Sequence, residues 1–257
     1  MSGLWRIAKN KPVHEPSWLQ IFKDCSFMLK KIESELKKLS YKKSRELAMR
    51  YFKTGQGQYG EGDLFLGIRM PDIRRIAGKY SDISFEDTLQ LLKSPYHEKR
   101  MLALIFLVNK YKKGKEQNQI YSAYMKNKKF INNWDLVDVS APNIVGAHLF
   151  DKDRSGLYRL AGSRSLWDRR IAIISTFYFI QKNDFEDTLK ISQLLLMDGE
   201  DLIHKASGWM LREVGKRNPE KEEDFLEKYS GSMPRTMLRY AIEKFPEKKR
   251  KKFLNKS

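Results

Sequence analysis

A tryptophan and a carboxylate stand four residues apart at Trp134 and Asp138. Side chains at this spacing share one face of a helix. Arg170 follows Asp138 after 32 residues, and Trp209 follows Arg170 after 39. In a chain built of helical repeats of about this length, the four side chains converge on one patch of the surface. Packing in the core is the alternative for the two indoles, because it is the commonest role of tryptophan on a helix.

Basic residues recur at a similar period, at Arg100, Arg170, Lys205 and Arg239. One basic residue at each equivalent helical position would line one face of a repeat protein with positive charge, as a phosphate-binding groove requires. Ordinary solvated positions are the alternative. The matching position near Leu136 has no base. A carboxylate within such a stripe weakens phosphate binding, so Asp138 indicates a chemical role.

The glycine-rich run GQGQYG at Gly55–Gly60 matches the pattern G-x-G-x-x-G. A dinucleotide site needs a strand before this pattern and a helix directly after it. Here the preceding residues 45–52 have a helical pattern, and EGDLFLGIRMP follows. A flexible loop is therefore expected in place of a nucleotide site.

Metal-binding patterns are absent from the sequence. The histidines, for which we expect capping or surface roles, are His14, His97, His148 and His204. They are scattered without ligand spacing, and the single cysteine, Cys25, cannot form an internal disulfide or a CxxC pair. We expect Cys25 to be a buried thiol. No metal and no cofactor are predicted.

The charge balance indicates the class of partner. The 257 residues include 50 Lys plus Arg and 32 Asp plus Glu, which gives a net charge of +18. Such a field attracts polyanions, nucleic acid first and an anionic membrane second, with solubility alone as the alternative. The N-terminal sequence lacks the apolar stretch of a signal peptide, and the longest apolar run, around residues 171–180, is too short to span a membrane. We expect a cytoplasmic protein that does not bind membranes.

An internal repeat predicts the fold. The pentapeptide FEDTL occurs at Phe85–Leu89 and again at Phe185–Leu189. Five stretches that are richer in apolar residues begin near Tyr96, Asn133, Leu166, Leu202 and Pro234. Their starts lie 37, 33, 36 and 32 residues apart, a period typical of stacked helix pairs. The sequence predicts an all-α fold: a curved solenoid of HEAT-like antiparallel helix pairs with a basic concave groove. A compact, non-repeating helical bundle is the alternative.

Capping residues support this prediction. Ser84 and Asp184 precede the two FEDTL copies as expected N-caps, and Gly114 stands where a helix should end. Pro219 and Pro234 are expected at helix starts. We predict a single HEAT-like repeat domain over residues 1–257, in which residues 1–45 form an N-terminal helical segment and residues 246–257 a basic, frayed tail.

Four stretches together resemble the AlkD-type family of bacterial DNA alkylation repair glycosylases. They are RYFK with FLGIRMPDIRR, NWDLVD, WDRRIAII and SGWMLREVGKRNP, and they extend from Arg50 to about Pro219. The resemblance implies a HEAT-like solenoid that wraps duplex DNA. It also implies hydrolysis of the N-glycosidic bond of N3- and N7-alkylated purines. The glycine-rich insert Gly55–Asp63 and the basic C-terminal end depart from the family pattern.

The resemblance also implies roles for individual residues. Asp138 matches the catalytic aspartate, Trp134 and Trp209 match the two groove tryptophans, and Arg170 matches the essential arginine, expected to hold a phosphate near the lesion. The matches to DNA-contacting residues are Tyr51, Arg74 and Arg212, to which the basic stripe adds Lys205 and Arg239.

We therefore expect a monofunctional DNA glycosylase for cationic alkylpurines. No lysine stands out as a Schiff-base nucleophile, and a monomer bound to double-stranded DNA containing alkylated bases is predicted. A noncatalytic HEAT-repeat protein that binds unusual or damaged DNA structures is the first alternative. A HEAT-type protein-interaction scaffold is the second.

Overall fold

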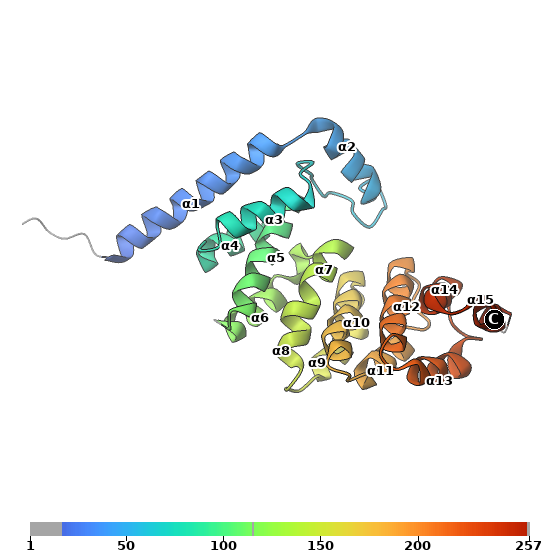
Figure 1. The fold of residues 1–257 in the computed structure, drawn as a ribbon. Helices are drawn as coiled ribbons and strands as arrows, with labels where there is room; N and C mark the ends of the chain where they lie inside the picture. The colour runs from blue at the N-terminus through green and yellow to red at the C-terminus, as the bar shows by residue number, and fades with distance from the viewer. Residues whose placement is uncertain (1–16, 115, 256–257) are drawn as a thin grey trace, which may run out of the picture.

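The computed structural model describes residues 17–114 and 116–255, apart from the side chains of residues 17–26. This part of the chain contains helices and no strand, and its only β pairing is an isolated bridge between Leu64 and Tyr96. Figure 1 shows the order of the helices along the chain. The first seven α-helices are α1 (Ser17–Leu39), α2 (Lys42–Tyr51), α3 (Met70–Lys79), α4 (Phe85–Leu92), α5 (His97–Lys112), α6 (Gln117–Lys126) and α7 (Trp134–Ala141). The remaining ones are α8 (Ala147–Leu149), α9 (Ser155–Ala161), α10 (Leu166–Gln181), α11 (Glu186–Leu194), α12 (Asp201–Gly215), α13 (Pro219–Tyr229), α14 (Arg235–Ala241) and α15 (Glu247–Leu254).

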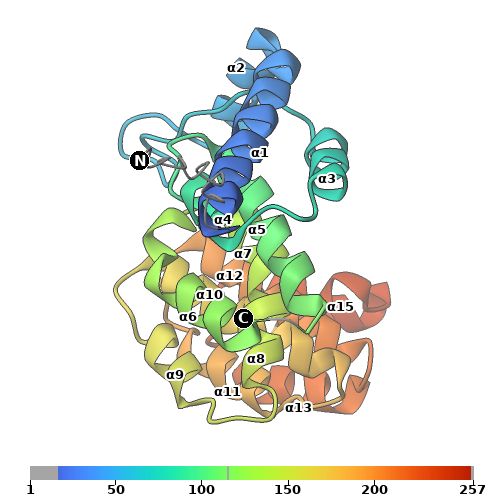
Figure 2. The ribbon, with the colours of Figure 1, turned by 90° about the vertical axis from the view of Figure 1, so that its left-hand side faces the viewer.

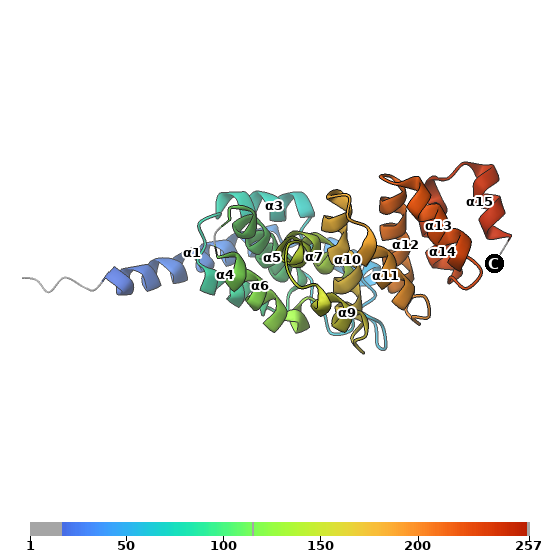
Figure 3. The same ribbon diagram turned by 90° about the horizontal axis from the view of Figure 1, so that it is seen from below.

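Five helices form the continuous inner row of the molecule. They are α5, α7, α10, α12 and α14, and each packs against the next. All five begin within one residue of the starts predicted from the apolar stretches. Figures 1 and 3 show them side by side, with α9, α11 and α13 on the other side of the row. The predicted helical repeat solenoid is confirmed.

Two glycines allow successive inner helices to pack closely. A Cβ at Gly146 would lie 2.2 Å from the carbonyl oxygen of Ser175 on α10. A Cβ at Gly208, on α12, would lie 2.3 Å from the carbonyl oxygen of Met237 on α14. In both cases the contacted carbonyl comes 29 residues after the glycine. The same backbone contact therefore recurs between two pairs of helices, which is further evidence of a repeat.

The second helix of the inner row, α7, changes its winding at its C-terminal end. Between α7 and α8 the residues Pro142–Gly146 form a π-helical turn. Proline has no N–H to donate to the carbonyl of Asp138, four residues earlier, and a π turn accommodates this loss. The loosened turn lies one helical turn after Asp138, a location typical of functional sites.

Two helices extend from the repeat stack at the N-terminal end. Figures 1 and 2 show α1 and α2 along one side of the molecule, with α9, α11 and α13 along the opposite side. Ile32 and Leu36 of α1 are fully buried in the main hydrophobic core, whereas α2 has no buried residue. Because α2 continues to Tyr51, the boundary predicted at residue 45 falls inside a helix.

The C-terminal residues differ from the predicted frayed tail. Residues 247–254 form α15, and the side chain of Phe253 is buried in a second hydrophobic cluster with α12, α13 and α14. The basic run conceals this helix in the sequence, because charged residues outnumber the apolar ones and Phe253 is the side chain of α15 that is buried. The prediction of a frayed tail was wrong for these residues.

Most predicted helix boundaries are confirmed. The hydroxyl of Ser84 accepts a hydrogen bond from the N–H of Asp87, and α13 and α14 begin at the predicted prolines. Gly114 follows α5 with a φ of 76°. Asp184 is not an N-cap, because its carboxylate instead binds the guanidinium of Arg154 at 2.7 Å.

Candidate functional site

A cleft of about 530 Å³ lies along the inner row of helices. It is lined by α7, α10, α12 and α14, by the end of α2 and by the loop that follows α2. Its residues are Tyr51, Lys53, Tyr59, Trp134, Asp138, Arg170, Glu200, Asp201, Leu202, Lys205, Trp209, Arg212 and Tyr240. The structure thus brings together seven of the nine residues predicted for the site. Its volume is in the range of pockets for small ligands, and its walls carry aromatic and charged side chains.

Asp138 and Arg170 form an ion pair at the floor of the cleft. Nε and one terminal nitrogen of Arg170 donate to the two carboxylate oxygens of Asp138 at 2.9 and 2.8 Å. The other terminal nitrogen donates to the carbonyl oxygen of Leu202 at 2.6 Å. The Arg170 side chain is 6% exposed and that of Asp138 is 18% exposed, so the carboxylate is the partner that a ligand can reach.

The electrostatic state of Asp138 follows from two opposing effects. Burial raises the pKa of its carboxyl group above the ordinary value, and the positive charge of Arg170 opposes this rise. The cleft therefore holds a carboxylate that is poorly solvated and more basic than an aspartate in water. Such a group stabilises a nearby positive charge more strongly than a hydrated carboxylate does.

Trp134 is held at the first turn of α7. The side chain of Asn133 caps this helix by accepting a hydrogen bond from the Trp134 N–H at 2.8 Å. The indole lies 6.1 Å from the ring of Tyr51, at an interplanar angle of 68°, and 5.6 Å from the ring of Phe52. Trp134 thereby connects the repeat stack to the end of α2.

Trp209 lines the cleft from α12. Its indole N–H donates to the carboxylate of Glu213 at 3.0 Å, and its ring packs 5.9 Å from that of Phe177. Glu213 also binds Lys216. The half-buried Trp209 is therefore fixed in orientation while one side still faces the cleft.

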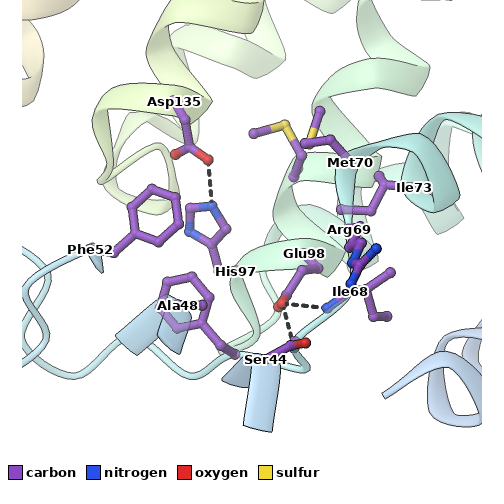
Figure 4. A pocket seen from close by; sticks show the side chains of 13 residues that line it. Ser44, Ala48, Phe52, Ile68, Arg69, Met70, Ile73, His97, Glu98 and Asp135 are labelled. Atoms are coloured by element: carbon purple, nitrogen blue, oxygen red, sulfur yellow. Dashed lines mark hydrogen bonds and ion pairs between the residues drawn. The ribbon is translucent and has the colours of Figure 1, made fainter. Parts of the chain in front are cut away.

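A buried histidine, His97, binds α7 through Asp135. Nε2 of His97 lies 2.8 Å from the carboxylate of Asp135. The imidazole packs against the rings of Phe52 and Phe65, at 4.9 and 4.7 Å, and these two rings lie 5.1 Å from each other. Burial lowers the pKa of His97, but the neighbouring carboxylates of Asp135 and Asp63 outweigh it and raise the pKa above the ordinary value. Figure 4 shows His97, Phe52 and Asp135 together in a small adjoining pocket.

Neighbouring Glu98 holds the segment that leads to α3. Its carboxylate accepts hydrogen bonds from the backbone N–H groups of Leu66, Gly67 and Ile68, at 2.8, 2.7 and 3.2 Å. Sequence reasoning missed both residues, since it assigned His97 a capping or surface role. His148 is buried too, His204 is half-buried, and His14 lies outside the described residues, as does the side chain of Cys25.

The predicted basic stripe is only partly present. Arg100 is buried and binds the carboxylate of Asp63 at 2.8 Å, and Arg170 is buried against Asp138. The stripe prediction was wrong for Arg100, because a basic residue at the repeat period can equally neutralise a buried carboxylate. Arg170 lines the cleft, but its guanidinium is engaged by Asp138. Lys205 does line the cleft, where it also binds Asp201 at 2.6 Å.

The other predicted DNA-contacting residues are distributed over the molecule. Tyr51 is 66% exposed at the edge of the cleft, and Arg212 lines the cleft while bound to Glu243. Arg74 lies in a separate hollow between α3, α5 and α7. Arg239 is exposed on α14, outside the residues that line the cleft. Two residues of the cleft that the sequence analysis missed, Lys53 and Tyr59, come from the glycine-rich stretch after α2.

Among the side chains of residues 27–114 and 116–255, no group of three or more His, Cys, Asp or Glu is arranged to hold a metal ion. None of the helices in the same residues is long and apolar enough to cross a membrane.

Comparisons with known proteins find a matching family and similar solved structures. A family model described as DNA alkylation repair enzyme matches residues 32–245. A solved structure described as a predicted DNA alkylation repair enzyme from Enterococcus faecalis is similar with a TM-score of 0.61. The two chains are 18% identical, and the match covers 80% of this chain and 96% of the other, so the likeness shows a shared fold. No curated protein sequence matches the chain.

Proposed function

The chain belongs to the family of DNA alkylation repair enzymes, and on this premise we propose that it is a monofunctional DNA glycosylase for cationic N3- and N7-alkylated purines in duplex DNA. The resemblance identified in the sequence is confirmed at the level of the family. The observation that carries the glycosylase proposal is the partly exposed Asp138 carboxylate, bound by Arg170 beside Trp134. A carboxylate in a cleft lined by basic side chains weakens phosphate binding, which favours a chemical role over holding DNA alone.

The proposed reaction starts from a base that is already charged. A purine alkylated at N3 or N7 carries a positive charge, so it accepts the electron pair of the breaking C1′–N bond and departs as a neutral base. Positive charge then develops on the deoxyribose, as in the transition state of glycoside hydrolysis. Water adds to C1′ and loses a proton, which leaves an abasic site and free alkylpurine.

Asp138 is the residue we assign to the developing charge. Its carboxylate stabilises the cationic sugar and orients the attacking water, whose proton it can accept. Burial strengthens this interaction because little water screens it. The faces of Trp134 and Trp209 enclose the sugar and favour the same positive charge through their quadrupoles.

Arg170 receives a different role from the one expected from the sequence. The expectation that it holds a phosphate does not fit its contacts, because its guanidinium is engaged by Asp138 and by the carbonyl of Leu202. We assign it to the positioning of the Asp138 carboxylate, which two parallel hydrogen bonds fix in orientation.

Contacts to the DNA backbone are assigned to the basic and aromatic residues of the cleft. Lys53, Lys205, Arg212 and Tyr51 surround Asp138 and Trp134 within the cleft. Arg74, in the hollow between α3, α5 and α7, and Arg239, exposed on α14, would contact phosphates beyond the lesion. A cytoplasmic monomer that acts without metal or cofactor stays a prediction.

The experiment that tests the proposal measures release of free base. The protein is incubated with duplex DNA carrying a single 7-methylguanine, and with a second duplex carrying 3-methyladenine, and free bases are quantified by mass spectrometry. Release of free methylpurine, with an intact abasic strand, is the expected result. No release of either base, together with tight binding to branched or gapped DNA, would instead favour the noncatalytic DNA-binding protein.

A further inference from the structure

Glu213, on the inner helix α12, accepts the hydrogen bond of the Trp209 indole. The indole N–H donates to Oε1 of the carboxylate at 3.0 Å, one helical turn later in the chain. The side chain of Glu213 is 14% exposed, so water competes only weakly for this carboxylate. A hydrogen bond to an ionised acceptor is also stronger than one to a neutral acceptor. Glu213 therefore holds the one polar group of the indole.

Two further contacts fix the backbone and the ring of Trp209. The preceding Gly208 packs so closely on α14 that a Cβ there would lie 2.3 Å from the carbonyl oxygen of Met237. The indole packs against the ring of Phe177 on α10, with the centroids 5.9 Å apart at an interplanar angle of 38°. Apolar packing is non-directional and accepts more than one ring orientation. The hydrogen bond to Glu213 is directional, so it selects one of them.

The carboxylate of Glu213 also contacts two cations. Its Oε1 binds Nζ of Lys216 at 2.6 Å and lies 3.8 Å from Nε of Arg212. Arg212 and Trp209 both line the cleft that holds Asp138. Among the described residues, those that line this cleft do not include Glu213. Any effect of Glu213 on a bound ligand is therefore exerted through its neighbours.

We propose that Glu213 is a positioning residue for the proposed reaction, which holds the Trp209 indole in the orientation that presents its face to the charged sugar. The inference rests on the proposed glycosylase activity and extends it to a residue that the sequence analysis did not assign. The hydrogen bond also polarises the indole and makes its face more negative, because hydrogen-bonded groups polarise one another. A more negative face attracts a cation more strongly.

The test compares two replacements of Glu213 with a matched control. Glu213→Gln keeps an oxygen that can accept the indole hydrogen bond, whereas Glu213→Met keeps the length of the side chain and offers only a weakly accepting sulfur. All three residue types favour helix to a similar extent. Glu186→Met is the control, because Glu186 also binds a lysine of its own helix, Lys190, but lies on α11 in a different hollow. Thermal unfolding of each variant shows whether the fold is retained.

The two replacements should differ in the single-turnover release of 7-methylguanine at saturating protein. Glu213→Met should slow release about ten- to 100-fold, because a hydrogen bond to a charged acceptor is lost. Glu213→Gln should stay within about fivefold of the unchanged protein, because the indole keeps an acceptor. Glu186→Met should match the unchanged protein. Equal rates in Glu213→Met and Glu186→Met would overturn the proposal, and so would equal losses in the two Glu213 variants.

A double replacement shows whether Glu213 acts through Trp209. Trp209→Phe keeps an aromatic face but has no N–H to donate. In this background, Glu213→Met should slow release by less than about twofold, because the hydrogen bond that it removes is already absent. An undiminished loss in the double variant would reveal a general structural role of Glu213 and contradict the proposal.

A binding measurement separates this proposal from the proposed function. A duplex with a cationic azasugar in place of one deoxyribose imitates the charged transition state, and a duplex with a neutral abasic analogue is the reference. The unchanged protein should prefer the cationic duplex, and Glu213→Met should reduce that preference about threefold or more. If the unchanged protein neither releases base nor prefers the cationic duplex, the proposed function fails and this inference with it. If it does both and Glu213→Met matches it, this inference alone is wrong.

Discussion

The carboxylate of Asp138 and the guanidinium of Arg170 face each other across two successive helices of the inner row, with hydrogen bonds of 2.9 and 2.8 Å. The pair connects α7 to α10, and the third contact of Arg170, to the carbonyl oxygen of Leu202, extends the connection to α12. The same two side chains thus hold three repeats in register and place a carboxylate in the cleft. Structure and proposed chemistry therefore depend on one buried ion pair.

Replacement of Arg170 by lysine should impair both of these roles. Lysine keeps the charge but cannot make two parallel hydrogen bonds to a carboxylate. We expect methylpurine release to fall about 100-fold or more and the free energy of unfolding to fall by about 2 to 4 kcal/mol. The neighbouring Arg169→Lys is a matched control, because Arg169 binds Asp198 through two nitrogens, at 2.6 and 3.1 Å, outside the cleft. Equal losses of release in both variants would contradict the role assigned to Arg170.

Phosphate contacts should be visible in the salt dependence of DNA binding. Each contact removed should lower the slope of log K against log salt concentration by about 0.9. We expect this change for Lys205→Ala, measured by fluorescence anisotropy, and no change for Lys190→Ala, because Lys190 lies in a different hollow. The same titration of Arg74→Ala and Arg239→Ala decides whether the duplex extends to those residues. An unchanged slope for Lys205→Ala would place this residue outside the interface.

The close contact of α12 with α14 should be sensitive to one methyl group. In Gly208→Ala the new Cβ would lie within 2.3 Å of a backbone carbonyl of α14. We expect the free energy of unfolding to fall by about 1 to 3 kcal/mol, as for other overpacked cores. Gly78→Ala is the control, since it adds a Cβ to an exposed helical glycine with no atom within 4 Å. That change should raise stability by about 0.5 to 1 kcal/mol in chemical denaturation.

Glu222 should make stability depend on pH. Burial, together with the negative charge of Glu223, raises the pKa of Glu222 to about 8, against an ordinary value of 4.5. The unfolded chain loses this proton at lower pH than the folded one, so stability should decrease as the pH rises from about 4.5 to about 8. Glu222→Gln cannot ionise and should remove most of this decrease. Thermal unfolding of the unchanged protein and of Glu222→Gln, followed at about pH 5 to 9, measures this pH dependence of stability. If stability depends on pH in the same way in Glu222→Gln and in the unchanged protein, Glu222 is not protonated in the folded protein.

The starts of the inner helices and the convergence of the cleft residues could be predicted from the sequence. Both follow from periodicity, since apolar residues mark the buried side of each repeat and residues one repeat apart lie side by side. Trp134, Asp138, Arg170 and Trp209 are brought together as the spacing indicated.

Other features depend on contacts that periodicity does not encode. His97 and Arg100 on α5 both contact Asp63, which lies in the loop after α2. The distance in sequence between this loop and α5 does not match the repeat. Tyr59 was missed for the same reason. The glycines around it are a sequence signal of a turn, and two of them, Gly57 and Gly62, have positive φ angles in the structure. The basic run before Phe253 concealed α15, because charge dominates its composition.

The proposed stabilisation of the charged sugar by the Asp138 carboxylate is tested most directly by the single-turnover rate of 7-methylguanine release from duplex DNA by Asp138→Asn. Asparagine keeps the size of the side chain and removes its charge, so release should fall about 100- to 10,000-fold with DNA binding retained. Asp135→Asn is the control, since this carboxylate binds His97 on another side of α7. Release by Asp138→Asn at the rate of the unchanged protein would contradict the account.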